Sequence, residues 1–316
     1  MSAPVADVAV LLPGFNEATP IAKVVADFRA ALPGAAIHVF DNNSTDGTAQ
    51  AARQAGAVVT PSPLQGKGHV VRHMFETVRA NHYVMADGDD TYPAGAAPAL
   101  LELARAGGAD MVVGVRLETH SSRSFRKFHR FGNHLISGLI SRMFRVRVTD
   151  ALSGYRVFSR AFVEGVPITS AGFQVETELT LLAVTRGFVF REVAVDYGER
   201  PAGSASKLNT YRDGILIVST IVLLFRDYKP LLFFTVVAAV FAAFSLLAGS
   251  LPIIEYYRTG LVPHFPRAIL AASLALAAML SLAIGIVLNT LNRYHHEAFE
   301  LHRKLMGQLR RGNWPG

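Results

Sequence analysis

Two long runs of uncharged, mostly apolar residues constrain this chain more than any other feature. Residues 230–254 and 268–292 contain no Asp, Glu, Lys or Arg. At a rise of 1.5 Å per residue, each run forms a helix of about 37 Å, enough to cross a hydrocarbon core of about 30 Å. Two buried helices of a soluble core are the alternative, but soluble helices seldom stay apolar on every face for so long. The sequence therefore predicts a two-helix transmembrane hairpin within residues 230–292.

Basic residues flank this hairpin unevenly. The linker 255–267 holds two of them, whereas the two outer flanks hold Arg226, Lys229, Arg293, Arg303, Lys304, Arg310 and Arg311. Because cytoplasmic flanks carry the excess of Lys and Arg, we expect both termini in the cytoplasm. The first twenty residues lack Lys and Arg and include acidic residues, so no signal peptide is expected. We expect an integral membrane protein with a cytoplasmic domain at 1–210, an interfacial juxtamembrane helix at 211–229 and a basic cytoplasmic tail at 293–316.

Composition narrows the classes of partner and chemistry. The chain has 31 Lys and Arg against 24 Asp and Glu, a formal net charge of +7, and no cysteine. A basic balance suits nucleic acid, anionic lipid or phosphorylated substrates, and the membrane spans make nucleic acid a poor partner. The lack of cysteine excludes disulfides, Cys-bound zinc and a thiol nucleophile.

The first two-thirds of the chain alternates strand and helix patterns. Apolar strand patterns at 5–12, 36–40, 58–59, 82–86 and 111–115 alternate with helical patterns at 19–32, 48–55, 68–80 and 94–106. Such βα alternation predicts an α/β domain whose mostly parallel sheet is covered on both faces. Ligands of such sheets bind beyond the carboxyl ends of the strands.

Polar residues follow three of these strands. The segments are Asn16-Glu17, Asp41 through Gly47, and Asp87-Gly-Asp89-Asp90. Turn and helix-cap roles are the simpler interpretation, and for Ser44, Asp46 and Thr48 that interpretation carries at least equal weight. Crowded carboxylates repel each other and need a counter-ion, typically a hard divalent cation shared with substrate phosphates. We expect Asp41, Asp87 and Asp89 to gather around one such cation.

A short glycine-flanked cation follows the third predicted strand. Lys67 lies between Gly66 and Gly68 in a loop before a predicted helix. This position suits either a diphosphate at the helix N-terminus or a solvated turn. The chain has neither the GxxxxGK[ST] pattern of P-loop nucleotide sites nor a His-rich metal motif.

Taken together, these segments resemble a known family. LPGFNE at 12–17, DNNSTDG at 41–47, GKG at 66–68 and DGD at 87–89 resemble, in order and spacing, motifs of family-2 glycosyltransferases with the Rossmann-like GT-A fold. Three further segments, DALSGYR at 150–156, ETEL at 176–179 and RPAGSASKL at 200–208, are similar to those of polyprenyl-phosphate sugar transferases such as dolichyl-phosphate mannose and glucose synthases. The resemblance covers roughly residues 5–210.

The resemblance implies roles for individual residues. The residues implied to bind the nucleotide sugar are Pro13, Asn16, Glu17, Asp41, Lys67, Asp87 and Asp89. Asp87 and Asp89 would also hold Mg²⁺ or Mn²⁺. Arg116, Arg200 and Lys207 would meet donor or acceptor phosphates, and the predicted catalytic set is Asp89, Asp150, Arg156 and Glu176. For Asp150 and Glu176, orienting sugar hydroxyls, orienting an arginine clamp and forming a structural ion pair all stay open.

The sequence departs from the family at two positions. Thr91 stands where mannose-type members have a Gln that joins the metal. Gly154 stands where another bacterial branch has an acidic residue, and the acid of this chain is Asp150 instead. The third metal ligand and any general base are therefore open.

A strongly basic segment occupies residues 123–147. It holds Arg123, Arg126, Lys127, Arg130, Arg142, Arg145 and Arg147, no acidic residue, and apolar residues at helical spacing. This pattern predicts an amphipathic helix in an anionic membrane interface; the alternative is a helix packed on the sheet with a solvated basic face. Arg126 and Arg130 are candidates for a lipid phosphate, because guanidinium groups match phosphate oxygens.

The expected activity follows from a sugar-nucleotide site next to a membrane. The resemblance implies transfer of a hexose, with inversion, from a UDP-glucose or GDP-mannose type donor to a polyprenyl phosphate. Two rival readings are a membrane transferase acting on a hydroxyl acceptor, with Glu176 or Glu178 as base, and a degenerate, non-catalytic membrane scaffold. Small residues at 238–239 and 242–243 suit a homo-oligomer formed through the membrane helices.

Overall fold

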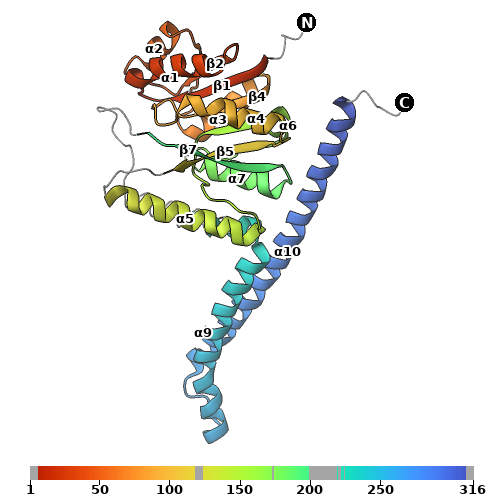
Figure 1. Cartoon of the computed structure of the whole chain (residues 1–316). Helices are drawn as coiled ribbons and strands as arrows, with labels where there is room; N and C mark the ends of the chain where they lie inside the picture. Colours follow the sequence, from red (N-terminus) through yellow and green to blue (C-terminus); the bar gives the residue numbers. More distant parts are fainter. Residues whose placement is uncertain are drawn as a thin grey trace. The chain divides into compact units, whose positions relative to one another are not determined.

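A computed structural model describes residues 6–117, 124–172, 174–198, 219, 222–223 and 225–310. The chain forms two compact units, Met1–Gly214 and Ile215–Gly316, and each is described by itself (Figure 1). The predicted interfacial helix at 211–229 and the predicted phosphate-binding residues Arg200 and Lys207 lie largely or wholly outside the described residues.

The first unit is built on a seven-stranded sheet of order β3-β2-β1-β4-β6-β5-β7. The strands are β1 (Ala6–Gly14), β2 (Ala36–Asp41), β3 (Val58–Pro61), β4 (Ala80–Met85), β5 (Met111–Leu117), β6 (Arg156–Ser159) and β7 (Phe190–Asp196). Neighbouring strands pair in parallel, except that β6 runs antiparallel to both β4 and β5. The predicted mostly parallel sheet is confirmed, and the antiparallel strand comes from the DALSGYR region, where the apolar pattern gave no strand.

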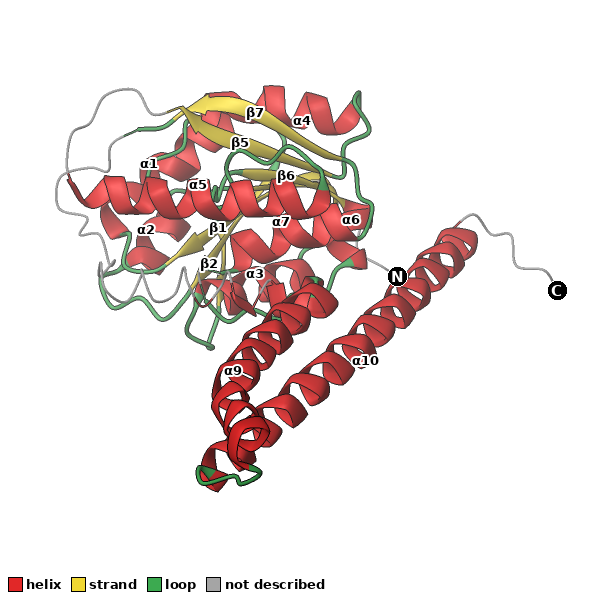
Figure 2. Ribbon diagram, turned by 90° about the horizontal axis from the view of Figure 1, so that it is seen from below, coloured by secondary structure: helices red, strands yellow, loops and turns green. Residues whose placement is uncertain are grey.

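Helices cover both faces of this sheet (Figure 2). They are α1 (Ala18–Ala31), α2 (Thr48–Gln54), α3 (Lys67–Thr77), a 3₁₀ turn η1 (Ala94–Ala96), α4 (Ala97–Arg105), α5 (Ser124–Phe144), α6 (Arg160–Gly165) and α7 (Val175–Thr185). The helical spacing of Ile21, Val25 and Phe28 gives α1 an apolar face that is buried in one core with Leu12 and Val84. Burying each such side chain stabilises the fold by about 1.5–3 kcal/mol.

The C-terminal half of helix α5 packs against the rest of the first unit. Ile136, Ser137 and Ile140 are buried, whereas Leu135 stays 44% exposed. The apolar residues therefore divide between an inner and an outer face. Packing on the domain, which the sequence left as the alternative, is confirmed for the inner face, and contact of the outer face with a membrane interface stays a prediction.

The second unit is a pair of long helices, α9 (Pro230–Thr259) and α10 (Phe265–Arg310). Both are long and apolar enough to cross a membrane, with mean hydropathies of 2.6 and 2.4. Small residues let them pack closely: Ser245 Oγ donates to Ala271 O at 2.8 Å, and a Cβ at Gly285 would lie 2.8 Å from Phe234 Cβ. α10 continues through residues 293–310, so the predicted tail is helical as far as the structure describes it.

Candidate active site

The carboxyl ends of β1 and β2 are held together by side chains of their loops. Asn16 adopts a left-handed φ of 53°, and its backbone N–H donates to Ser44 Oγ at 2.9 Å. Asp46 accepts from the backbone N–H groups of Ala18 and Thr48, each at 3.0 Å, and so satisfies donors at the starts of α1 and α2. The helix-cap interpretation is confirmed for Asp46, whereas Ser44 and Thr48 accept from the backbone N–H groups of Asn16 and Glu17 and so hold the loop before α1.

Asp41 ends β2 with an unusual carboxylate. Its Oδ1 is buried and has no hydrogen-bond partner among the described residues. The next residue, Asn42, fixes the loop that follows β3 by donating to Ser62 O and Leu64 O at 3.0 and 2.7 Å and by accepting from Gly66 N at 2.9 Å. A buried acceptor without a donor costs free energy until a ligand supplies one, so Asp41 is suited to an N–H group of a bound base.

The glycines around Lys67 are required by close backbone contact. A Cβ at Gly66 would lie 2.3 Å from Ala171 O, and one at Gly68 would lie 2.0 Å from Ser170 O. Gly68 N also donates to Ala171 O at 3.1 Å. This contact holds the loop against the segment before α7 and directs Lys67 towards that helix.

Lys67 bridges two carboxylates from distant parts of the chain. Its Nζ lies 2.5 Å from Asp87 Oδ1 and 2.5 Å from Glu176 Oε1. Burial opposes the charge on Lys67, but the two carboxylates outweigh this and raise the pKa of Lys67 above its ordinary value. The sequence left a diphosphate site and a solvated turn open for Lys67; the side chain is only 11% exposed, which excludes the solvated turn, and its role at the nucleotide sugar stays a prediction. The single positive charge of Lys67 thus pairs with two negative charges. The other oxygen of Glu176, Oε2, is buried without a hydrogen-bond partner among the described residues.

Asp89 lies two residues further along the same turn. It is 3% exposed and accepts hydrogen bonds from Thr91 Oγ1 at 2.6 Å and Thr91 N at 3.2 Å. Thr91, which replaces the Gln of mannose-type members, is thus a partner of Asp89. Asp90 has a φ of 61° and pairs with Lys23 at 2.8 Å, away from this bond.

The expected grouping of three carboxylates around one cation is wrong. No group of three or more His, Asp or Glu side chains within the described ranges could hold a metal. The reason lies in the strand order, because β1 separates β2 from β4 and so places the end carrying Asp41 roughly 10 Å from the turn of Asp87 and Asp89. Proteins often hold Mg²⁺ or Mn²⁺ through one or two carboxylates plus substrate phosphates, so Asp87 and Asp89 stay the predicted metal ligands.

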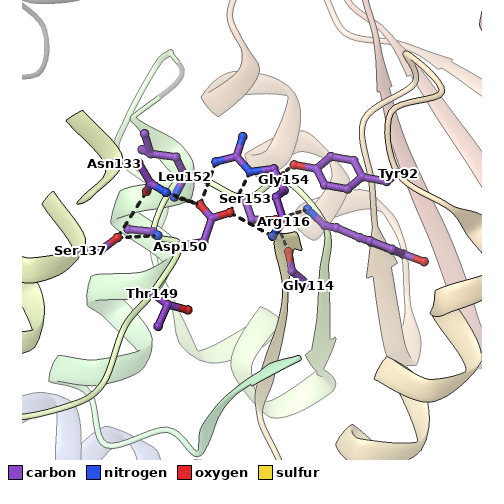
Figure 3. Close-up of polar contacts among 12 residues, drawn as sticks. Tyr92, Gly114, Arg116, Asn133, Ser137, Thr149, Asp150, Leu152, Ser153 and Gly154 are labelled. Carbon is purple, nitrogen blue, oxygen red and sulfur yellow. Dashed lines mark hydrogen bonds and ion pairs between the residues drawn. The ribbon is translucent and has the colours of Figure 1, made fainter. Parts of the chain in front are cut away.

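The DALSGYR segment meets this turn at Gly154. A Cβ there would lie 2.8 Å from Asp87 Oδ2, so the family's acidic alternative has no room. Gly154 N donates to Tyr92 Oη at 2.9 Å, and Ser153 Oγ donates to Gly114 O at 2.6 Å (Figure 3). These bonds fix the segment between β4 and β5.

Arg156 is a structural residue. It is fully buried and donates to Ser153 O, Ala151 O and Thr180 Oγ1 at 2.8, 3.0 and 3.0 Å. Burial lowers the pKa of its guanidinium to about 10, so the group stays charged at neutral pH. With no exposed surface, Arg156 cannot contact a substrate here, and its predicted catalytic role is corrected to holding the 151–153 loop.

Arg116 and Asp150 form the second charged pair of the site (Figure 3). Arg116 Nε donates to Asp150 Oδ2 and Nη2 to Oδ1, both at 2.8 Å, and Asn133 Nδ2 of α5 donates to Oδ1 at 3.0 Å. Burial opposes ionisation of Asp150, but the bonds and charge of Arg116 keep its pKa below the ordinary value. The ring of Tyr197 lies 5.5 Å from the guanidinium carbon. Asp150 is therefore paired with an arginine, which fits two of the alternatives left open by the sequence, orienting an arginine clamp and forming a structural ion pair.

Arg116 has more N–H donors than Asp150 takes up. A guanidinium has five N–H groups, and Asp150 takes two of those of Arg116. The other three have no hydrogen-bond partner within the part of the chain that the structure describes, and the side chain is 25% exposed. The other predicted phosphate ligands are not placed: the side chains of Arg126 and Arg130 on α5, like Arg200 and Lys207, lie outside the described residues.

Sequence reasoning missed several contributors to the site. Asn133 and Tyr197 contact the Arg116–Asp150 pair, and Tyr92 Oη accepts from Gly154 N. The signal for Asn133 was present, because Asn133, Ser137 and Ser141 recur every four residues and make one polar row on α5. All three bond the segment from Val148 to Ala151.

Comparison with known proteins decides the family. The family model described as Glycosyl transferase family 2 matches residues 9–166. The glycosyltransferase AglJ of Haloferax volcanii is 32% identical over 303 residues, covering 96% of this chain and 97% of AglJ.

The chain belongs to glycosyl transferase family 2. A further relative in this family, described as a dolichyl-phosphate hexose transferase of Haloferax volcanii, is 32% identical over 216 residues, covering 68% of this chain and 92% of the relative. Among solved structures, the glucosyl-3-phosphoglycerate synthase of Mycobacterium tuberculosis with Mn²⁺, UDP and phosphoglyceric acid aligns with a TM-score of 0.57, 21% identity and coverage of 70% of this chain and 78% of the synthase. That likeness confirms the fold expected of a family-2 glycosyltransferase.

Proposed function

We propose that this family-2 glycosyltransferase moves a hexose from a nucleoside-diphosphate sugar to a polyprenyl phosphate, with inversion at the sugar carbon. The observation that carries the proposal is the Arg116–Asp150 clamp. Asp150 turns the guanidinium so that three N–H donors remain, at the same sheet edge as Asp87. A clamp of this kind matches the oxygens of a phosphate, and the named relative is a dolichyl-phosphate hexose transferase.

The donor half of the proposal rests on the loops after β1, β2 and β4. Asp41 Oδ1 is buried and accepts no hydrogen bond from the described residues. It suits the N–H group that uracil and guanine both present, so UDP-glucose and GDP-mannose both stay as candidate donors. Pro13, Asn16 and Glu17 would complete the nucleoside pocket. Asp87 and Asp89 would hold Mg²⁺ or Mn²⁺, whose chemistry is to neutralise charge on the departing diphosphate.

Glu176 is proposed to contact the sugar. Its Oε1 is fixed by Lys67, while Oε2 is buried without a partner among the described residues. A sugar hydroxyl can donate to this oxygen, and the ion pair would then hold the ring in register with Arg116. Asp87 shares the same lysine, so donor and sugar contacts are set by a single cation.

The acceptor chemistry needs little from the protein. A phosphate monoester has its second pKa near 6 and is largely dianionic at neutral pH. Its oxygen forms the new bond to the sugar carbon while the bond to the diphosphate oxygen breaks, and the nucleoside diphosphate leaves. No proton is transferred in this step, so the residues have only to orient the acceptor and stabilise the leaving group.

The hydroxyl-acceptor alternative requires a carboxylate base, with Glu176 and Glu178 as the candidates; in the proposal, the remaining oxygen of Glu176 binds the sugar. Glu176 is paired with Lys67. Glu178 accepts from Thr169 N at 2.8 Å, from Thr169 Oγ1 and from Ser170 N at 3.0 Å, which holds the loop before α7. The scaffold alternative conflicts with an intact Asp87–Lys67–Glu176 cluster, which costs desolvation free energy without serving the core.

The membrane half of the proposal rests on α5, α9 and α10. α9 and α10 are proposed to anchor the enzyme, with both termini in the cytoplasm. The outer face of α5, which carries the exposed Leu135, is proposed to lie in the lipid interface. Arg126 and Arg130 on the same helix are proposed to guide the lipid phosphate to Arg116. The small residues of α9 remain the proposed contact of a homo-oligomer.

One assay tests the proposal. The full-length enzyme in lipid nanodiscs is incubated with Mg²⁺, polyprenyl phosphate and a panel of nucleotide sugars. The masses of the lipid products are then measured by mass spectrometry. We expect a polyprenyl-phosphate hexose and release of nucleoside diphosphate. Transfer to hydroxyl acceptors alone would support the first alternative, and a donor neither transferred nor hydrolysed would support the scaffold.

A further inference from the structure

A carboxylate outside every motif fixes the loop that carries Asp150. Glu192 lies on β7, and one of its oxygens accepts from Thr149 N at 2.9 Å and Asp150 N at 3.3 Å. Its other oxygen accepts from Thr149 Oγ1 at 2.8 Å. This single side chain therefore joins the segment between α5 and β6 to the edge strand of the sheet.

This bonding determines where the carboxylate of Asp150 lies. Asp150 is 3% exposed, so its side chain has little freedom once its backbone is placed. β7 is also the strand that pairs with β5, the strand of Arg116, in the register Val113↔Glu192 and Arg116↔Val195. Glu192 and Arg116 thus belong to one rigid pair of strands, and the loop of Asp150 is fastened to that pair at both points.

We propose that Glu192 is a positioning residue for the phosphate clamp. It holds the 149–150 backbone so that Asp150 takes two N–H groups of Arg116 and leaves the other three turned to the acceptor. Asn133 on α5 adds a second restraint by donating to Asp150 Oδ1. The inference rests on the proposed function, because it assigns Glu192 a role only if Arg116 binds the acceptor phosphate.

The role predicts a selective effect on acceptor binding. Glu192→Ala frees the loop and lets Arg116 rotate, so the KM for polyprenyl phosphate should rise about tenfold. The KM for the nucleotide sugar should stay within about twofold, since Asp41, Asp87 and Lys67 are untouched. A purely structural role would instead lower kcat or the amount of folded enzyme and leave both KM values unchanged.

Two further variants refine the test. Glu192→Gln keeps an oxygen that accepts from both backbone N–H groups, so the acceptor KM should return close to the wild-type value. Arg191→Ala, a matched change at the neighbouring exposed position of β7, should leave the acceptor KM unchanged. An equal rise in Arg191→Ala would assign the effect to the edge strand in general and overturn the proposal.

A double-mutant cycle with Arg116→Ala gives the decisive result. If Glu192 acts through Arg116, Glu192→Ala should add no further rise in acceptor KM once Arg116 has been removed. Additive rises would overturn the proposal. If Glu192→Ala does not fold, Thr149→Val removes only the Oγ1 bond and should give a smaller rise that also disappears in the Arg116→Ala background; a rise that persists there would contradict the inference.

The same series separates this inference from the proposed function. Wild-type enzyme that makes no polyprenyl-phosphate sugar, or an Arg116→Ala enzyme with an unchanged acceptor KM, would contradict the proposed function. A product-forming wild type and a weakened Arg116→Ala enzyme, combined with an unaltered Glu192→Ala enzyme, would overturn only the role of Glu192.

Discussion

A Cβ atom at Gly154 would lie 2.8 Å from Asp87 Oδ2. Gly154→Ala must therefore displace the Asp87 carboxylate, whose Oδ1 is held by Lys67 at 2.5 Å. We expect kcat to fall by at least tenfold, measured as sugar transfer under saturating donor. Gly95→Ala is the matched control, because a Cβ there meets no atom within 4 Å. Equal activity of the two variants would contradict the assignment of Asp87 to the donor site.

Replacing Lys67 should lower the stability of the first unit, and the loss should depend on pH in a defined way. Lys67→Met leaves the carboxylates of Asp87 and Glu176 without their cation, which should destabilise the first unit by roughly 3–5 kcal/mol at neutral pH. The pKa of Lys67 is raised in the folded protein, so its contribution is complete below its ordinary value of 10.5. The stability gap between wild type and variant should therefore be constant from neutral pH upward and shrink only above pH 10.5.

The control for this prediction is Lys23, a surface lysine that also pairs with two carboxylates. Lys23 pairs with Asp27 and Asp90 at 2.8 Å each, but its side chain is 61% exposed. Exposed pairs contribute about 0–1 kcal/mol, so Lys23→Met should change the unfolding midpoint little. Urea melts of the purified enzyme in detergent compare the two. A gap for Lys67→Met that narrows near neutral pH would contradict the raised pKa.

The sequence predicted the residue types at the strand ends but not how they pair. Asp87 and Asp89 follow β4 as expected, and their spacing suggested a shared cation. The partner of Lys67 could not be predicted, because Glu176 comes from a helix whose place over the sheet depends on the close contact of Gly68 with Ser170. The catalytic role predicted for Arg156 was wrong for a related reason. A sequence motif gives the type of a residue but not its exposure, and Arg156 is fully buried.

At the scale of elements, the alternating strands and helices as far as β5 were predictable and β6 was not. The first five strands follow a local apolar pattern, with helices between them at regular intervals. β6 is four residues long and inserts antiparallel between β4 and β5. Its place is decided by pairing partners far away in the sequence, which no local periodicity records.

Helix α5 shows two faces with different tasks. Its inner face carries Ile136, Ile140 and the polar row that bonds the Asp150 loop. Its outer face carries Leu135 and the exposed Arg142. The sequence predicted an amphipathic helix and left two environments open for its apolar residues, lipid and the sheet, because packing against either produces the same spacing.

The outer face of α5 supplies an element-scale prediction. Arg142→Glu should lower transfer several-fold in vesicles rich in anionic lipid, since each basic residue near such a surface contributes about 1 kcal/mol of attraction. Transfer in neutral vesicles should change little. Arg53→Glu makes the same charge change on α2, at another exposed position, and is expected to have no effect. Equal losses in the two variants would show that net charge, and not α5, controls lipid dependence.

At the scale of the whole molecule, two units of different solvent preference occur in one chain. The first unit buries its apolar residues around a sheet, whereas α9 and α10 expose theirs along most of their length. The two long apolar helices were predictable, because uncharged apolar runs of such length seldom form any other structure. The ends of the two helices were harder to predict. α9 extends to Thr259 and α10 to Arg310, beyond the apolar runs, because the polar residues there also favour a helix.

The proposed function of both units depends on one chemical claim, that the accepting atom is a phosphate oxygen of a lipid. The most direct measurement offers the full-length enzyme a polyprenyl phosphate and the matching polyprenol, at equal concentration in one set of vesicles with Mg²⁺ and labelled nucleotide sugar. We predict label in the polyprenyl-phosphate product alone, and loss of that product in Arg116→Ala. Label on the polyprenol, or a phosphate product that Arg116→Ala forms as fast as wild type, would contradict the account.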